Sequence, residues 1–238
     1  MAKVLVIATS RKTRGGITSV VKAHETGEQW AIFNCRWIET HRDGNPIRKM
    51  GYFVKGFLTF LILLPSADLV HIHLAAVNRK MPFVFLTKLF GKKMIIHLHF
   101  PDTETTLRDR RLSSRYGWCI KKADVCIALS YTWKQLIERT YNVNNVRVLY
   151  NPCPIVDRIP YTKRENYILF AGTVSQRKGN QDLVTAFAKV AKKYPDWKIK
   201  IAGNGDIDKG QKQAKVLGIE NQVEYLGWIS GNDKERLF

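Results

Sequence analysis

Short β-branched segments and helical patterns alternate along the whole chain, and this alternation strongly limits the folds that it can adopt. The first segment, KVLVIATS, predicts a strand, and the polar loop RKTRGGITS follows it. Val20, Val21 and His24 then fall at helical spacing. A strand, a glycine-containing loop and a helix in this order are typical of the start of a doubly wound α/β domain.

The same order recurs along the rest of the chain. Further strands are predicted at residues 31–38, 68–74, 92–100, 124–130, 146–152, 167–172, 197–203 and 223–228. Helices are predicted between them at residues 46–64, 77–91, 113–123, 131–141, 181–194 and 211–218. Gly91 is a C-cap signal and Ser130 is an N-cap signal, so each marks one helix end.

Residues 152–165 contain three prolines and no periodic pattern, so we place a domain boundary there. We expect two Rossmann-like doubly wound domains that face a cleft, at residues 1–155 and 156–238. The second supplies only about three strands, where a complete sheet of this kind has about six. Because the chain also stops at DKERLF, within the start of a predicted helix, we expect it to be a fragment or a natural truncation.

Composition excludes several other classes of protein. With 45% hydrophobic and 25% charged residues, the chain is of the soluble globular type. Its four cysteines are scattered singly, which favours reduced thiols in a cytoplasm over a disulfide framework or a thiolate zinc site. The N-terminus lacks the pattern of a signal peptide, and no run of about 20 apolar residues could span a bilayer.

The formal net charge of +19 indicates an acidic partner. Residues 1–158 hold 25 Lys and Arg against 11 Asp and Glu, so the excess is concentrated in the first two-thirds of the chain. Nucleic acid, an anionic membrane face and phosphorylated substrates all fit this charge. The basic residues are dispersed over many predicted elements, with no helix-turn-helix or aromatic RNA-binding motif, so we do not expect nucleic acid.

Three loops follow the predicted carboxyl ends of strands, which is where open α/β sheets bind ligands. In the first loop, Gly15 and Gly16 precede a helix whose free N–H groups can face an anion. The spacing is not that of the dinucleotide fingerprint, so a plain tight turn is an equal alternative. In the second, Arg177 and Lys178 precede a helix start, where fixed positive charge and the helix dipole suit a diphosphate. The third loop, at 203–206, adds two more glycines.

Four of the six histidines form two H-x-H pairs, His71 with His73 and His97 with His99. Side chains at i and i+2 share a face of a strand, so the four could cluster if the strands are neighbours, and zinc has to be considered. We expect no metal, because a zinc site would usually include a Cys or a carboxylate. His71 and His97 should instead pack in the core and bond to the backbone. His99 lies where the chain leaves the sheet, and a neutral imidazole there can bond a sugar hydroxyl or stabilise developing charge.

Together these parts resemble glycosyltransferase family 4, retaining enzymes of the GT-B fold, over essentially the whole chain. The matching segments are GGITSVVK, DLVHIH, KKMIIHLH, ADVCIALSYTWKQLI, VLYNP, ILFAGTVSQRKGNQDLVTAFAKV, IKIAGNGD and VEYLGWI. Their combination most resembles bacterial members that build capsule, exopolysaccharide or lipopolysaccharide. The resemblance implies transfer of a sugar from a nucleotide-sugar donor to a glycan or lipid-linked acceptor, in the cleft between the domains, without a metal or another cofactor.

The resemblance gives the first domain the acceptor side of the reaction. Gly15 and Gly16 would lie against the donor diphosphate or sugar, and His99 would contact the transferred sugar. A lipid-linked acceptor would also account for the basic charge, because each basic residue near an anionic inner leaflet adds about 1 kcal/mol of attraction. The apolar residues 53–64 are more simply explained as a helix that packs under the sheet. We therefore expect a cytoplasmic protein that binds the inner membrane face through its basic surface.

The resemblance gives the second domain the nucleotide sugar. Arg177 and Lys178 would bind the donor phosphates, and the nucleotide would be flanked by Gly203, Gly205 and Trp228. Thr173 stands where the family usually has an Arg, so one phosphate contact is missing or is supplied by Arg177. The paired glutamates of the family would lie beyond residue 238, and we therefore expect this chain alone to be inactive or nearly so.

Two alternatives remain from the sequence. One is a basic module that binds nucleic acid or a membrane without catalysis, which would use the net charge directly. The other is a nucleotide-sugar epimerase of the same fold.

Overall fold

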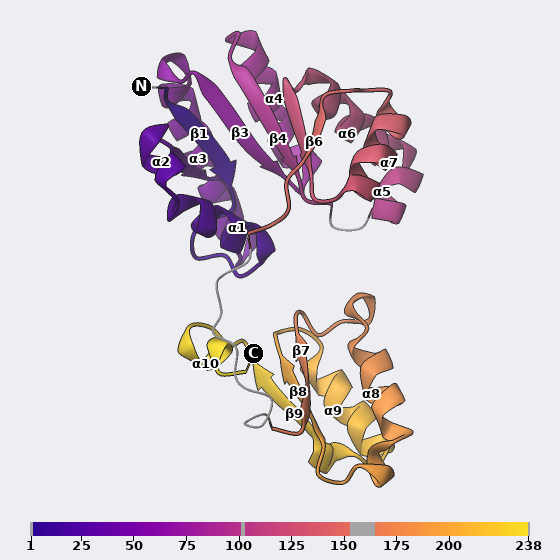
Figure 1. Cartoon of the computed structure of the whole chain (residues 1–238). Helices are drawn as coiled ribbons and strands as arrows, with labels where there is room; N and C mark the ends of the chain where they lie inside the picture. The colour runs from indigo at the N-terminus through magenta and orange to yellow at the C-terminus, as the bar shows by residue number, and fades with distance from the viewer. Residues whose placement is uncertain (1, 101–102, 153–164, 238) are drawn as a thin grey trace. The chain divides into compact units, whose positions relative to one another are not determined.

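The computed structural model describes residues 2–100, 103–152 and 165–237 (Figure 1). The chain divides into two compact units, Met1–Pro154 and Ile155–Phe238. The predicted proline-rich boundary lies, from residue 153 to residue 164, outside the described residues. Each unit has its own sheet and its own core, so the two are described in turn.

The first unit is built on six parallel strands in the order β2-β1-β3-β4-β5-β6. The strands are β1 Val4–Ala8, β2 Arg36–Glu39, β3 Leu69–Leu74, β4 Lys93–Leu98, β5 Val125–Ala128 and β6 Val146–Val148. The chain first moves outward from β1 to β2 and then returns to add β3 on the other side of β1. The loops after β1 and β3 therefore flank the point where the strand order reverses, which is the usual ligand crevice of such sheets.

Helices connect these strands on both faces of the sheet. They are α1 Gly16–Glu25, α2 Glu28–Ile32, α3 Pro46–Leu63, α4 Val77–Leu89, α5 Thr103–Arg108, α6 Arg110–Lys122 and α7 Tyr131–Tyr141. The predicted caps are confirmed: Ser130 accepts a hydrogen bond from the N–H of Trp133, and Gly91 adopts φ +63° after α4. The described residues include no helix with both the length and the hydrophobicity needed to cross a bilayer.

Strand alternation gives the first sheet two unlike faces. Val70, Ile72 and Leu74 of β3 enter the main core, which α3, α4, α6 and α7 cover. His71 and His73 of the same strand point to the other face, where the apolar cluster around Val6, Ala8, Val21 and Trp37 lies under α1. The polar residues of β3 and β4 are therefore collected on one side of the sheet.

The second unit has three parallel strands in the order β7-β8-β9 (Figure 1, orange to yellow). They are β7 Tyr167–Ala171, β8 Lys198–Ala202 and β9 Val223–Gly227, with helices α8 Asn180–Ala188, α9 Ile207–Val216 and α10 Asn232–Glu235. Its core is formed mainly by Val184, Phe187, Ile199 and Ile201. The alternation of strand and helix in this unit is as predicted.

Several predicted bounds were wrong. The strand predicted at 31–38 is instead the end of α2, a left-handed turn at Asn34 with φ +40°, and the short strand β2. Asn tolerates this conformation, so it allows a helix and a strand within one continuous apolar run. The helix predicted at 181–194 ends at Ala188 and continues only as a 3-10 turn, Ala191–Lys193.

Candidate functional site

The carboxyl edge of the first sheet presents an open helix start. Gly15 precedes α1 with φ +155°, no side chain caps the first turn, and a side chain added at Gly15 or Gly16 would meet no atom within 4 Å. The first N–H groups of the helix are thus not satisfied by a capping side chain. This is the local geometry that can receive an anion, as the sequence predicts for Gly15 and Gly16.

His99 follows β4 at the same edge. Its backbone N–H donates to the carbonyl of Leu74 at 2.9 Å, and its Nε2 lies 3.0 Å from Nδ1 of His73. Burial, with the neighbouring His24, lowers the pKa of His99 to about 4. The ring is therefore neutral at pH 7, in the state needed to exchange a hydrogen bond with a sugar hydroxyl.

The histidines gather into one cluster. β3 and β4 are neighbours and His73 pairs with His97, so the predicted common face is confirmed. The ring centres of His73 and His97 are 4.9 Å apart, and those of His97 and His99 are 4.5 Å apart. Burial holds the pKa of His73 well below its usual value and lowers that of His97 to about 2.

The expectation that the structural histidines bond to the backbone is wrong for His97. Both of its ring nitrogens are buried without a hydrogen-bond partner among the described residues, as is Nε2 of His71. The strand pattern predicts where these rings point, but not whether a backbone carbonyl comes within reach of them.

In the second unit, Arg177 and Lys178 lie in the loop after β7. They form an exposed 3-10 turn, Gln176–Lys178, and Gly179 follows with φ +76° as the N-cap of α8. No side chain caps α8. Two cations and open backbone N–H groups therefore stand together, as predicted for a diphosphate site.

Gly203 and Gly205 are required by the packing of neighbouring loops. A Cβ at Gly203 would lie 1.8 Å from the carbonyl oxygen of Gly172, and one at Gly205 would lie 2.2 Å from that of Val174. The N–H of Val174 donates to Asn204, and the N–H of Asp206 donates back to Val174. These glycines let the loops after β7 and β8 run side by side, and this shapes the edge at which a ligand would bind.

Trp228 completes this edge. It follows β9 directly and is 46% exposed, and the carbonyl of Gly227 accepts a hydrogen bond from Gly203. The second unit therefore brings together all its predicted residues, because each follows the carboxyl end of one of three adjacent parallel strands. In the first unit, Gly15 and His99 both lie at the carboxyl edge of the sheet, after β1 and β4.

Two further residues were missed by sequence reasoning. His24, alone on α1, has its ring centre 6.2 Å from that of His73, which places it over the histidine cluster. Lys80 on α4 is buried; it donates to Oγ1 of Thr40, and burial lowers its pKa to about 7. The sequence signal for Lys80 is a lysine among the apolar positions of a predicted helix. The signal for His24 is its helical spacing from Val20 and Val21, which are buried.

Comparison with known proteins identifies the family of the chain. Residues 18–155 match the family described as Glycosyltransferase Family 4, and residues 156–238 match Glycosyl transferases group 1. An uncharacterised glycosyltransferase of Haemophilus influenzae is 29% identical over 171 residues, which are 71% of this chain and 45% of that protein. A lipopolysaccharide 1,6-galactosyltransferase of Salmonella typhimurium is 30% identical over 49% of this chain and 33% of its own length. The chain thus spans less than half the length of these relatives.

Solved structures confirm the GT-B fold. The Anabaena protein HepE, solved in complex with UDP and glucose, matches with a TM-score of 0.70 and 16% identity, over 100% of this chain and 71% of HepE. WaaG, a glycosyltransferase of lipopolysaccharide biosynthesis, matches with a TM-score of 0.66 and 14% identity, over 98% of this chain and 72% of its own. The match to the family covers more than half of the residues. The chain belongs to glycosyltransferase family 4.

Proposed function

We propose that this protein transfers a sugar, with retention of configuration, from a nucleotide-sugar donor to a glycan or lipid-linked acceptor in the synthesis of a bacterial surface polysaccharide. The observation that carries the proposal is the carboxyl edge of the second sheet. Three adjacent loops there combine a basic pair, an uncapped helix start and an exposed tryptophan. These elements suit a nucleoside diphosphate: cations and N–H groups can bind its phosphates, and an aromatic surface can stack on its flat base.

Charge neutralisation is the main catalytic effect proposed. When the sugar leaves, negative charge develops on the diphosphate, and Arg177 and Lys178 are placed to stabilise it. Thr173, exposed at the start of the same loop, cannot do so, which leaves this role to the basic pair. The proposed reaction uses no metal or other cofactor on the diphosphate.

His99 is proposed to orient the transferred sugar. Its Nε2 is engaged with His73, so Nδ1 is the ring nitrogen that would meet a sugar hydroxyl. Because the ring is neutral at pH 7, it can donate or accept there without adding a charge to the site.

The surface of α3 supports a lipid-linked acceptor. The helix packs on the sheet through Gly56 and Phe60. Its opposite side exposes an apolar row at helical spacing, the α3 stripe: Ile47, Met50, Val54, Leu58 and Ile62. Arg48 and Lys55, also exposed, lie on the same helix. An apolar row with basic neighbours suits the interface of an anionic membrane.

A hollow of about 490 Å³ lies beside the start of α3. It is lined by Pro46, Lys49, Met50, Phe53, Asn78 and Arg79. Apolar walls with two cations suit the junction of a lipid chain and its phosphate, so we assign the acceptor to this part of the first unit. The protein would thus act at the inner face of the cytoplasmic membrane.

Donor binding tests the proposal on the chain itself. UDP, GDP and ADP are titrated calorimetrically into the wild type and into the double variant Arg177→Gln/Lys178→Gln. We expect one of the three nucleoside diphosphates to bind the wild type. The double variant should bind it with an affinity lower by about 30-fold or more, because each charge-assisted hydrogen bond contributes about 1.5–3 kcal/mol. The matched control is Lys192→Gln/Lys193→Gln, an exposed basic pair of the same unit that precedes β8 rather than following a strand.

Turnover is measured on the longest form of the protein that its gene encodes, as nucleotide release from a panel of nucleotide sugars. Transfer to an added acceptor supports the proposal, and interconversion of the sugar nucleotide without transfer would favour the epimerase. If His99→Ala and Lys178→Ala both leave turnover within about twofold of the wild type, the assigned site is wrong. Sequence-preferring binding of DNA or RNA at moderate salt would favour the nucleic-acid module instead.

A further inference from the structure

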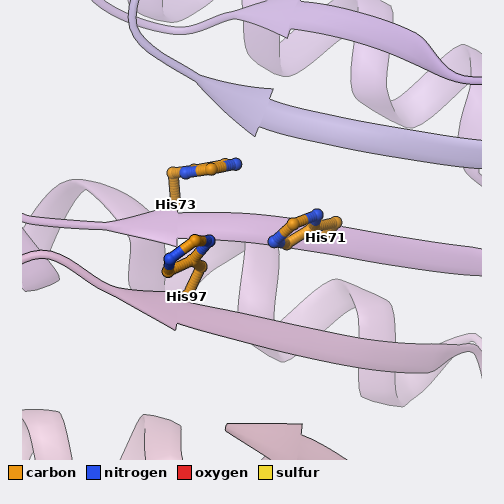
Figure 2. A group of neighbouring side chains, drawn as sticks. All are labelled: His71, His73 and His97. Atoms are coloured by element: carbon orange, nitrogen blue, oxygen red, sulfur yellow. The ribbon is translucent and has the colours of Figure 1, made fainter. Parts of the chain in front are cut away.

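Three strand histidines on one face of the first sheet form a compact group that the proposed reaction does not use. His71 and His73 project from β3 and His97 projects from β4, on the same side (Figure 2). Their nearest ring nitrogens all lie within 4.8 Å of one another. Each position is fixed by strand register, so the group depends on the sheet rather than on a loop.

The nitrogens of this group are not satisfied by the protein. His73 is 1% exposed and His97 is 0% exposed. Nε2 of His71, Nε2 of His73 and both ring nitrogens of His97 are buried and have no hydrogen-bond partner within the described ranges. A buried polar atom without a partner costs about 1–3 kcal/mol, so four of them together call for a ligand that can accept all three rings.

The spacing of the rings suits a metal ion. Imidazoles around a tetrahedral ion with bonds of about 2.0–2.1 Å have ring centres about 5 Å apart. The three separations are 4.6 Å for His71 and His73, 4.9 Å for His73 and His97, and 5.7 Å for His71 and His97. The ring centre of His24 lies 6.5, 6.2 and 6.4 Å from these three, more than 1 Å beyond that separation, so the ring of His24 has to move inward to become a fourth ligand.

We propose that His71, His73 and His97 bind a divalent transition-metal ion, with zinc as the best fit, and that His24 closes the site as the fourth ligand. A donor set made only of imidazole excludes Mg²⁺ and Ca²⁺, which require oxygen ligands. Zn²⁺ accepts a four-nitrogen tetrahedral shell without a geometric preference of its own. The site is closed and structural: it ties α1 to β3 and β4, and the ion itself does not contact the reacting groups.

The site would also orient His99. Metal bound at Nε2 of His73 leaves its Nδ1 protonated, and this N–H then donates to Nε2 of His99, 3.0 Å away. Such an outer hydrogen bond normally fixes the tautomer of its partner. His99 would then carry its own proton on Nδ1, the nitrogen proposed to face the sugar.

Metal binding is tested on the untagged chain after it has been stripped with a chelator and dialysed. ZnCl₂ is titrated calorimetrically, bound metal is counted by elemental mass spectrometry, and CoCl₂ is added in parallel to report geometry. We expect one ion per chain, the strong visible absorption of tetrahedral Co²⁺, and a rise in melting midpoint on the order of 5 °C when zinc is in about a hundredfold excess over its dissociation constant.

The variants are His71→Leu and His97→Leu, which keep the volume of the core and remove a ligand. Both should lose stoichiometric binding and the cobalt spectrum, and circular dichroism confirms that each remains folded. His41→Leu is the matched control, because His41 is the one described histidine that neither belongs to this group of three nor has a ring contact with it, and this variant should bind zinc as the wild type does. His24→Ala should weaken binding and change the cobalt spectrum while the three strand ligands remain.

Two results would overturn the proposal. One is a wild-type chain that takes up less than about a tenth of an ion under these conditions, while the double variant His71→Leu/His97→Leu is more stable than the wild type in the presence of chelator. The three histidines would then serve only to pack the core. The other is equal zinc binding by the wild type and both leucine variants, which would locate the metal elsewhere.

Discussion

The carboxyl edges of the two sheets carry their chemistry in opposite ways. At the edge of the first unit, three polar side chains are buried: Lys80, His73 and His97 are all nearly inaccessible, although Arg11 and Lys12 in the loop after β1 are exposed. All six histidines of the chain lie there. In the second unit, which has no histidine, Arg177 and Lys178 are exposed on loops whose course depends on Gly203 and Gly205. The stability of the first edge should therefore depend on protonation and metal binding, and that of the second edge on the backbone conformation of its glycines.

The largest effect is expected from Gly205→Ala, which tests whether backbone shape controls the second edge. Gly205 has φ +132°, and an added Cβ would lie 2.2 Å from the carbonyl oxygen of Val174. Backbone strain and a clash with backbone together should cost about 3–5 kcal/mol and unfold the second unit in part. Hydrogen exchange, resolved by peptide, measures which unit opens.

Gly218→Ala is the control for this prediction. Gly218 also has a positive φ, +68°, but a Cβ there meets no atom within 4 Å. Its cost should therefore be only the conformational one, about 1 kcal/mol. Equal costs at the two positions would show that the packing of the loops after β7 and β8 does not hold the second edge in place.

Lys80→Met tests the first edge, where burial controls protonation. The pKa of Lys80 is about 7 in the folded chain against 10.5 for an ordinary lysine, so the unfolded chain binds the proton more tightly. The burial of Lys80 therefore lowers the free energy of unfolding below pH 10.5, and this loss of stability grows as the pH falls to 7. Methionine removes this penalty and should stabilise the first unit by about 2–4 kcal/mol at pH 7.

The pH dependence separates this cause from simple repacking. The gain from Lys80→Met should shrink as the pH rises from 7 towards 10, because the unfolded lysine then also loses its proton. Urea unfolding at pH 7, 8.5 and 10 measures it. A gain that is constant with pH would contradict the lowered pKa of Lys80, and a loss of stability would show that its bond to Thr40 outweighs its burial.

The order of elements could be predicted from the sequence because each strand and helix has its own period. The errors fell where two elements share one apolar run, as at 31–38, where a left-handed Asn34 divides helix from strand. Strand order could not be predicted, since it depends on which surfaces pack together and not on local pattern. The cluster of His71, His73 and His97 needed that order, because it forms only when β3 and β4 are neighbours.

In the candidate site too, local sequence pattern predicts the position of a residue along the chain but not its surroundings in the fold. Positions after strands, such as His99 and Arg177, were predictable because parallel strands place their carboxyl ends at one edge. The burial of Lys80 and the half-burial of His24 were not, because burial is set by residues distant in sequence, such as Thr40 beside Lys80. The sequence also does not show why glycine is required at 203 and 205. The structure does, because the backbone of a neighbouring loop occupies the space that a Cβ would need.

The α3 stripe also gives the first unit an exposed apolar surface. Ile62 is 77% exposed there, and Ile62→Glu should weaken binding to anionic vesicles about tenfold, because it replaces an apolar contact with a repelled charge. Co-sedimentation with phosphatidylglycerol vesicles measures the change. Val216→Glu is the control, since Val216 is 86% exposed on the second unit. Equal weakening by both variants would show that net charge alone attracts the chain to the membrane.

The smallest effect is expected at the start of α7, where the N-cap side chain already accepts a hydrogen bond from a backbone N–H group of the helix. Ser130 caps α7, whereas Gly15 and Gly179 leave α1 and α8 without a side-chain cap at the carboxyl edges of the two sheets. Ser130→Ala should therefore cost about 1 kcal/mol of stability in the first unit and leave diphosphate binding unchanged, because only a structural N–H loses its partner. Ser130→Asp should restore most of the loss. Urea unfolding measures the stability, and calorimetry measures the diphosphate affinity. If Ser130→Ala lowers the diphosphate affinity, then a capped helix start also affects ligand binding, and the distinction between capped structural and uncapped ligand-binding helix starts is wrong for this protein.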